Sequence, residues 1–321
     1  MKHELACSAI AAYSLLGILA TMLNAAETKP VELHARTRTA SKDSVAKDPA
    51  VKGAPDQFTV GEKTLAWQPA KTALIVVDMW DDHWCRGAAA RVAEMAGPMN
   101  KLIAEARQRG VFVVHCPSTT VDFYKNTPQR RRAQEAPFAA APIKLATDER
   151  WGTAWCWPDK SREGTFPIDD SDMGCDCREK CEIREAWSRQ IATIDIADGD
   201  AITDNGQELY NLFAERGIDN VIILGVHLNM CVLGRPFAIR QLVHLGKNVV
   251  LVRDMTDTMY NHEMAPKVDH FAGTDLVVEH IEKYWCPSIL STDLVGGQPF
   301  RFKEDKRPAG KAAATPIKAA R

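Results

Sequence analysis

The fold is decided by a run of five apolar residues that ends in an acid, Ala73-Leu74-Ile75-Val76-Val77-Asp78. An uninterrupted apolar run of this length is typical of a strand that is covered on both faces. Helix-like stretches separate it from further short apolar runs, which lie at 111–114, 191–196, 221–224, 249–252 and 276–281. This alternation predicts a three-layer, doubly wound α/β/α fold around a mainly parallel sheet.

The composition limits the classes of protein to which the chain can belong. Of its 321 residues, 45% are hydrophobic and 26% are charged, which is ordinary for a folded protein and excludes wholesale disorder or a collagen-like fibre. The formal net charge is -2. A net charge so close to zero provides no positive electrostatic field to attract DNA or an anionic membrane. We therefore expect no nucleic-acid partner.

The two ends of the chain differ from its middle. Lys2 and His3 precede a short apolar run that is followed by small residues, which predicts a secretory signal peptide at 1–26. The mature protein is then exported, to the periplasm or the extracellular space, with no membrane attachment after cleavage. Polar composition predicts a flexible linker at 27–68, and basic composition predicts a flexible tail at 293–321. One domain remains, at 69–292.

Two reactive side chains follow strands of the predicted sheet. Asp78 ends the first apolar run, and Cys231 lies between the run at 221–224 and a helix-like stretch. Ligands of parallel sheets bind at the carboxyl ends of the strands, where these residues meet. Alone, Asp78 is equally explained as a helix cap and Cys231 as a small buried hydrophobe. Together they predict a nucleophile and a group for proton transfer.

The stretches LIVVDMW at 74–80 and GVHLNMCV at 225–232 resemble the isochorismatase-like cysteine hydrolases, a superfamily that includes nicotinamidases and N-carbamoyl amidohydrolases. The resemblance covers roughly 72–290 and implies a six-stranded parallel sheet and an Asp–Lys–Cys triad. It implies Cys231 as the nucleophile and Asp78 as the base. It also implies a cis peptide at Val226-His227 and an oxyanion site made by the backbone N–H groups of His227 and Cys231.

The lysine of the triad has no counterpart where the family places it. The stretch 189–196 contains no lysine, and its only basic residue is Arg189, which becomes the candidate replacement. An arginine supplies positive charge but cannot cycle a proton. The Asp-x-His metal motif of nicotinamidases is also absent after the second strand, at 114–122. We therefore expect no metal in the active site and no cofactor.

An insertion at about 128–187 is rich in cysteine and tryptophan. Its four cysteines, Cys156, Cys175, Cys177 and Cys181, form either two disulfides or one zinc site, and export favours disulfides. Of the nine cysteines in the chain, an odd number remains after Cys7 leaves with the signal and Cys231 stays free, so at least one more is unpaired. Buried Cys116 is the candidate. The pairing of Cys85 and Cys286, with each other or with the insertion, stays open.

The remaining predictions concern substrate and function. Trp80, Trp84 and Met230 are expected to line the substrate site, and the tryptophans of the insertion form either a satellite core or an apolar lid. The leading hypothesis is an exported cysteine hydrolase that cleaves a small amide or carbamoyl C–N bond. The alternatives are a noncatalytic small-molecule-binding protein and an isochorismatase-type vinyl-ether hydrolase. The resemblance also favours a homo-oligomer.

Overall fold

The computed structural model describes residues 29–40 and 58–308. The predicted signal peptide therefore lies outside the described residues. Among the residues that are described, no helix combines the length and the apolar character that a bilayer crossing demands.

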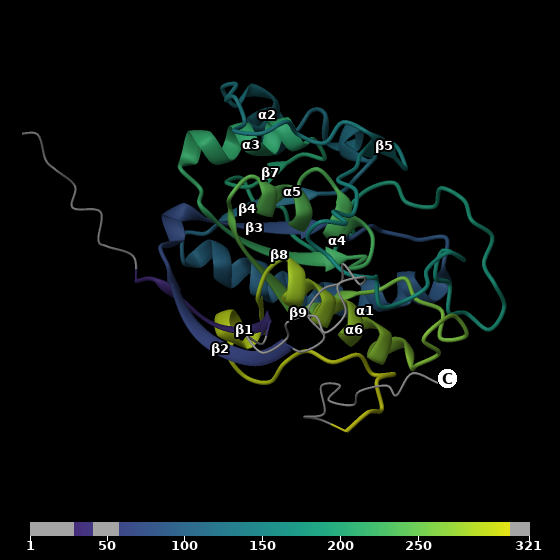
Figure 1. Cartoon of the computed structure of the whole chain (residues 1–321). Coiled ribbons are helices and arrows are strands. Elements are labelled where there is room, and N and C mark those ends of the chain that lie inside the picture. Colours follow the sequence, from purple (N-terminus) through teal and green to yellow (C-terminus); the bar gives the residue numbers. More distant parts are fainter. Residues whose placement is uncertain (1–28, 41–57, 309–321) are drawn as a thin grey trace, which may run out of the picture.

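The main sheet has eight strands and runs through the middle of the molecule (Figure 1). Six of them are mutually parallel, which confirms the predicted fold class. In their order across the sheet, the strands are β2 (Phe58–Trp67), β1 (Val31–Ala40), β10 (Ser288–Ile289), β9 (Asn248–Asp257), β8 (Asn220–Val226), β3 (Thr72–Val77), β4 (Phe112–Cys116) and β7 (Ala201–Ile202).

Strand β3 lies at the centre of the parallel part, between β8 and β4, and every one of its residues is buried. Its alternate side chains enter two separate cores. Ala73 and Ile75 pack into one core and Leu74 and Val76 into the other, so the apolar run is explained by helices on both faces.

The helices cover the two faces of this sheet. Figure 1 shows α2 and α3 together at the β7 edge, while buried side chains of α1 pack into the second core. The helices are α1 (Arg86–Gln108), α2 (Pro128–Glu135), α3 (Gly206–Arg216), α4 (Cys231–Gly234), α5 (Ile239–His244), α6 (His270–Tyr284) and α7 (Thr292–Val295). The shorter elements are the 3-10 turns η1 (Pro69–Lys71) and η2 (Val121–Tyr124) and a hairpin of β5 (Glu149–Arg150) and β6 (Thr153–Ala154).

Two predicted strands are wrong. Residues 191–196 form turns, and β7 at 201–202 takes the place beside β4. Residues 276–281 lie inside α6, where Val277, Val278 and Ile281 are buried. That spacing matches one face of a helix as well as a short strand, and the sixth parallel strand is β10 instead.

The predicted linker and tail are also wrong wherever the structure describes them. Strands β1 and β2 pair antiparallel along ten residues each, and β1 joins the sheet beside β10. The buried side chains of β1 alternate with polar ones and are Val31, Leu33 and Ala35. The many charged residues of this segment make the alternation typical of a strand hard to recognise in the sequence. In the tail, Phe302 stacks on Phe271 at 5.5 Å between ring centroids.

The predicted disulfides are not formed. The eight cysteines that the structure describes are all free, including Cys116, Cys156 and Cys286. Cys156 lies apart from the other three cysteines of the insertion, whose sulfurs gather instead around Cys85. Sequence spacing alone could not show this, because the four thiols that meet come from segments about ninety residues apart.

A buried carboxylate fastens the inserted region to the core. Glu163 accepts two hydrogen bonds from Arg240, at 3.0 and 3.1 Å, and further bonds from His280 Nε2 and Trp285 Nε1 at 2.9 and 3.1 Å. Burial by itself would raise the pKa of Glu163, but these partners outweigh it and lower the pKa to about 2.

We expect Glu163→Gln to lower the free energy of unfolding at neutral pH by about 2 to 3 kcal/mol, because it removes charge-assisted hydrogen bonds and leaves Arg240 unpaired. The folded pKa lies below the unfolded one, so this contribution is present above the unfolded value of 4.5 and is lost as pH falls towards about 2. Urea unfolding at neutral and at acid pH measures this change in the free energy of unfolding. Glu185→Gln, an exposed carboxylate of the same region, is the control and should change little; equal losses in the two variants would contradict the assignment.

Candidate active site

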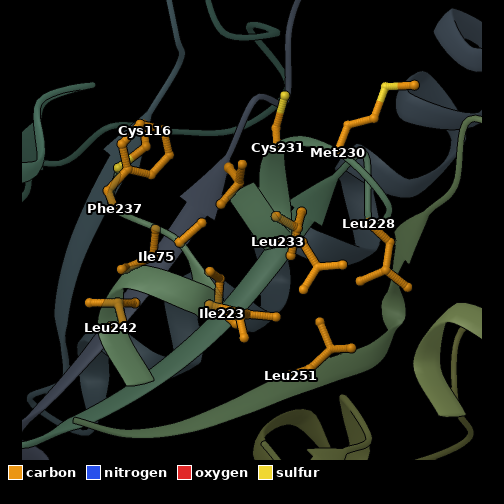
Figure 2. Close-up of a cluster of buried hydrophobic side chains, with 14 of the residues drawn as sticks. Ile75, Cys116, Ile223, Leu228, Met230, Cys231, Leu233, Phe237, Leu242 and Leu251 are labelled. Atoms are coloured by element: carbon orange, nitrogen blue, oxygen red, sulfur yellow. The ribbon is translucent and has the colours of Figure 1, made fainter. Parts of the chain in front are cut away.

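Cys231 begins the short helix α4, directly after the turn that follows β8. The turn is closed by the backbone N–H groups of Met230 and Val232, which both donate to the carbonyl of His227, at 3.0 and 3.2 Å. Cys231 belongs to a buried apolar cluster, and Figure 2 shows its sulfur directed away from Leu233 and Leu251. Cys231 is 4% exposed, so its thiol is almost completely shielded from solvent.

Asp78 follows β3, the strand next to β8, and is fully buried. Its backbone is held in the left-handed region, with φ of 46°, by a hydrogen bond from its N–H to the carbonyl of Cys116 at 3.1 Å. Its Oδ1 atom accepts from the backbone N–H of Ser118 at 2.7 Å. The two reactive residues can approach because Gly225 lies against Val77, where a Cβ would come within 2.1 Å of the Val77 carbonyl oxygen.

The structure therefore brings the predicted nucleophile and base together, and each alters the pKa of the other. Burial raises the pKa of Asp78 to about 6, although Arg235, the Cys231 thiol and Ser118 each oppose this rise. Burial and the nearby Asp78 carboxylate raise the pKa of Cys231, and Arg235 opposes this rise too. At neutral pH the site thus holds a protonated thiol beside a carboxylate that has largely ionised.

The positive charge beside this pair belongs to Arg235, not to Arg189. Arg235 Nε lies 3.8 Å from Asp78 Oδ2, and the side chain is 2% exposed. Arg189, by contrast, has a side chain that is 44% exposed and lies 3.9 Å from Asp81 Oδ2. The backbone of Arg189 is fixed beside Asp81, because the Arg189 carbonyl accepts a hydrogen bond from the backbone N–H of Asp81 at 2.9 Å. The sequence does carry a signal for Arg235: it lies four residues after Cys231 and is the only lysine or arginine between 217 and 239.

Arg235 is held in place by the β5–β6 hairpin of the inserted region. Its Nη1 atom donates to the carbonyl of Arg150 at 3.1 Å and to Thr153 Oγ1. Asp78 Oδ2 and Arg235 Nε nevertheless have no hydrogen-bond partner among the described residues. Two buried, unsatisfied polar atoms beside a thiol are costly for stability and are typical of a site that completes its bonds with a substrate.

The turn between β8 and α4 also carries the candidate oxyanion site. The peptide bond Val226-His227 is cis, as the resemblance implies. The backbone N–H of Leu228 donates to the carbonyl of Asp257 at 2.7 Å. The backbone N–H of Cys231 has no acceptor in the part of the chain that the structure describes. This donor is therefore available to an oxygen that develops negative charge next to the sulfur.

A series of ring contacts runs from Trp80, one of the predicted lining residues, to His227 in the turn between β8 and α4. Trp80 stacks on Trp187 of the inserted region at 4.4 Å between ring centroids, and His83 stacks on Trp187 at 5.6 Å. His83 in turn meets His227 edge-on at 4.9 Å. Burial lowers the pKa of His83 to about 4 and that of His227 well below its usual value, so both rings are neutral near pH 7. Trp84 and Met230 are almost fully buried, at 7% and 8% exposure.

A cavity of about 1500 Å³ opens next to the site, between the inserted region and the core. Its lining includes Asn229, two residues before Cys231, and Trp155. Neither Cys231 nor Asp78 is among the lining residues. The Trp155 ring packs against Gly234, where a Cβ would lie 2.4 Å from it, so Trp155 stands between the cavity and the first turn after the thiol.

Comparisons with known proteins concern the fold. No family model and no curated protein matches the chain. A solved cysteine hydrolase from Pseudomonas syringae pv. phaseolicola 1448A matches with 18% identity and a TM-score of 0.43, over 71% of this chain and 92% of that one. An isochorismatase from Pseudomonas putida KT2440 matches with 12% identity and a TM-score of 0.40, over 70% and 90%.

An N-carbamoylsarcosine amidase from Thermoplasma acidophilum matches with 15% identity and a TM-score of 0.33, over 58% of this chain and 83% of that one. At these identities the similarity is one of fold alone.

Proposed function

We propose that the chain is a cysteine hydrolase that cleaves the C–N bond of a small amide or carbamoyl substrate. The observation that carries the proposal is the buried group of Cys231, Asp78 and Arg235, in which a protonated thiol faces a carboxylate with a pKa of about 6 and a fixed positive charge. A base with a pKa near the working pH is suited to proton transfer.

In the first half of the reaction, Asp78 takes the proton of the Cys231 thiol as the sulfur attacks the carbonyl carbon. The carbonyl oxygen becomes an oxyanion, which accepts from the backbone N–H groups of Cys231 and His227. Asp78 then returns the proton to the leaving nitrogen, the C–N bond breaks, and a thioester on Cys231 remains.

In the second half, water attacks the thioester. Asp78 takes a proton from this water, and the sulfur leaves and is reprotonated. Arg235 offsets the negative charge of the site throughout but carries no proton, because a guanidinium stays protonated. The chain thus differs from a triad with lysine in relying on Asp78 for every proton transfer.

The surroundings favour a small and uncharged reacting group. The His83 and His227 rings are neutral, and Trp80 and Trp187 stack with their apolar faces together, so these rings supply no charge to a substrate. Amide and carbamoyl groups are planar and uncharged, so they can pack against uncharged aromatic rings. Export of the enzyme, predicted from residues 1–26, is part of the same proposal.

The proposal is tested with a panel of primary amides, N-carbamoyl amino acids and the vinyl ether isochorismate, assayed with the unmodified chain, Cys231→Ala and Asp78→Asn. We expect ammonia or amine release from at least one C–N substrate, a thioester on Cys231 detected by mass spectrometry, and loss of both in the two variants. Binding without turnover would instead indicate a noncatalytic binding protein. Vinyl-ether turnover that survives in Cys231→Ala but not in Asp78→Asn would indicate the vinyl-ether hydrolase.

A further inference from the structure

Four cysteine thiols converge outside the active site. Cys85 precedes the first residue of α1, and Cys175, Cys177 and Cys181 belong to one loop of the inserted region. Their sulfur atoms all lie within 4.8 Å of one another. Cys85 and Cys175 are buried and the other two are half-buried, so the cluster is largely removed from solvent.

The spacing of the sulfurs fits one metal ion better than disulfides. Cys85 Sγ lies 3.8 Å from Cys177 Sγ. Zinc–sulfur bonds of about 2.3 Å in a tetrahedron place neighbouring sulfurs about 3.8 Å apart. A disulfide requires about 2.05 Å. Cys177 and Cys181 are also separated by three residues, which falls within the usual spacing of paired zinc ligands.

Backbone N–H groups at the start of α1 point at two of the four sulfurs. Gly87 donates to Cys177 Sγ at 3.2 Å and Arg86 donates to Cys181 Sγ at 3.5 Å. Such donors stabilise thiolates, the form of cysteine that binds metal, and orient them around the ion.

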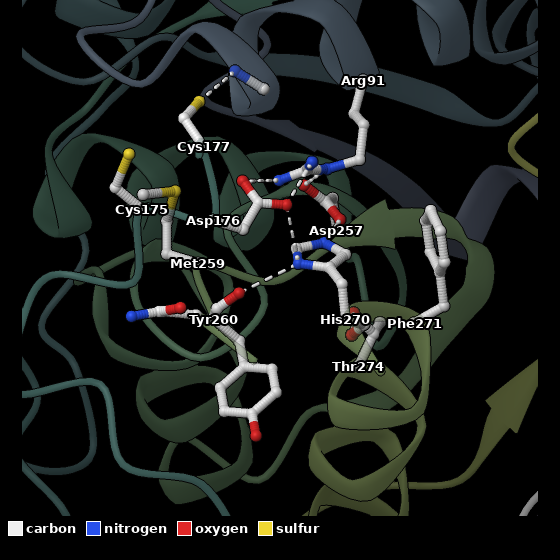
Figure 3. Close-up of polar contacts among 12 residues, drawn as sticks. Arg91, Cys175, Asp176, Cys177, Asp257, Met259, Tyr260, His270, Phe271 and Thr274 are labelled. Atoms are coloured by element: carbon white, nitrogen blue, oxygen red, sulfur yellow. Dashed lines mark hydrogen bonds and ion pairs between the residues drawn. The ribbon is translucent and has the colours of Figure 1, made fainter. Parts of the chain in front are cut away.

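The loop is fastened to the core beside the cluster. Asp176, between two of the cysteines, pairs with Arg91 of α1 at 2.8 Å and with His270 of α6 at 3.2 Å (Figure 3). Arg91 also pairs with Asp257 at the end of β9, at 2.8 Å. Gly87 leaves room for this packing, because a Cβ there would lie 2.8 Å from Asp176 Oδ1. The sulfurs are therefore held together by contacts from three elements.

We propose that Cys85, Cys175, Cys177 and Cys181 bind one structural zinc ion. All four ligands are protein thiolates, so the site is closed and leaves no position for substrate. Its role is to tie the inserted loop to the start of α1, which directly follows the segment with Trp80 and His83. This inference goes beyond the proposed hydrolysis and does not depend on it.

The test is the metal content of the purified, folded full chain, measured by mass spectrometry for zinc and iron after expression with zinc in the medium. We expect one zinc ion per chain in the unmodified protein and background zinc in the double variant Cys177→Ser/Cys181→Ser. The matched control is Cys156→Ser, a thiol of the same inserted region outside the cluster, which should retain one zinc ion. A chelator should lower the melting temperature of the unmodified chain and the control, and leave the double variant unchanged.

The proposal is overturned if the folded, unmodified chain carries only background zinc, if iron takes the place of zinc, or if thiol counting shows the four cysteines joined in disulfides. Equal zinc in the double variant and the control also overturns it. None of these measurements uses turnover, so failure of the zinc site and failure of the proposed function are separate results.

Discussion

Replacement of Cys231 by serine is expected to lower turnover of the C–N substrate by about 10⁴-fold or more, which is the scale of losing a covalent nucleophile. A hydroxyl has almost the same size as a thiol but is far harder to deprotonate. Asp78, with a pKa of about 6, is too weak a base to activate it. The fold should be unaffected, because the two side chains have nearly the same size and the sulfur is directed away from Leu233 (Figure 2).

Steady-state kinetics and intact-protein mass spectrometry measure this effect. The serine variant should show neither turnover nor the covalent intermediate, while keeping the melting temperature of the unmodified chain. Cys156→Ser, which lies outside the site, should keep full activity. Retention of most activity in Cys231→Ser would show that the thiol is not the nucleophile.

The second large effect is expected at Arg235, and its matched control is Arg189. Arg235→Met leaves the buried Asp78 carboxylate without its positive neighbour. We expect a loss of about 3 to 5 kcal/mol in the free energy of unfolding, because removal of one partner leaves an uncompensated buried charge. The pKa of Asp78 should rise above about 6, because the positive charge of Arg235 no longer stabilises the ionised carboxylate. Turnover should fall by about 10²- to 10³-fold.

Arg235→Lys should be less damaging to activity than Arg235→Met, because it keeps the charge. It should still be less stable than the unmodified chain, because it loses the fork that donates to the carbonyls of Arg150 and Trp151. Arg189→Met, which loses a half-exposed ion pair with Asp81 and a contact with the Phe123 ring, should leave the pH profile and turnover nearly unchanged. If the effects of the two methionine variants were reversed, the assignment of the cation to Arg235 would be wrong.

The parts of this molecule that the sequence predicts well are those with dense local signals. Continuous apolar runs identify β3 and β8, because strands buried on both faces have no polar side to interrupt them. The parallel order of these strands then places Asp78 and Cys231 at one edge of the sheet. The fold class and the central pair of the site follow from these two runs.

The parts that the sequence does not predict depend on contacts between distant segments or on weak patterns. A short, mostly apolar stretch such as 276–281 fits both a strand and a helix face, and only packing distinguishes the two. Strand β1 has three inward apolar residues among charged ones and is stabilised by pairing with β2. The thiol cluster joins Cys85 to a loop about ninety residues later, so its membership cannot be obtained from spacing.

The most direct test of the central claim is the rate at which iodoacetamide alkylates Cys231, followed by peptide mass mapping between about pH 5 and 9 in the unmodified chain and in Asp78→Asn. If Asp78 takes the thiol proton, the rate in the unmodified chain rises with an inflection near pH 6, and this inflection disappears in Asp78→Asn. If both proteins show the same profile, with an inflection near about 8.5 as for an ordinary free thiol, Asp78 does not serve as the base for Cys231.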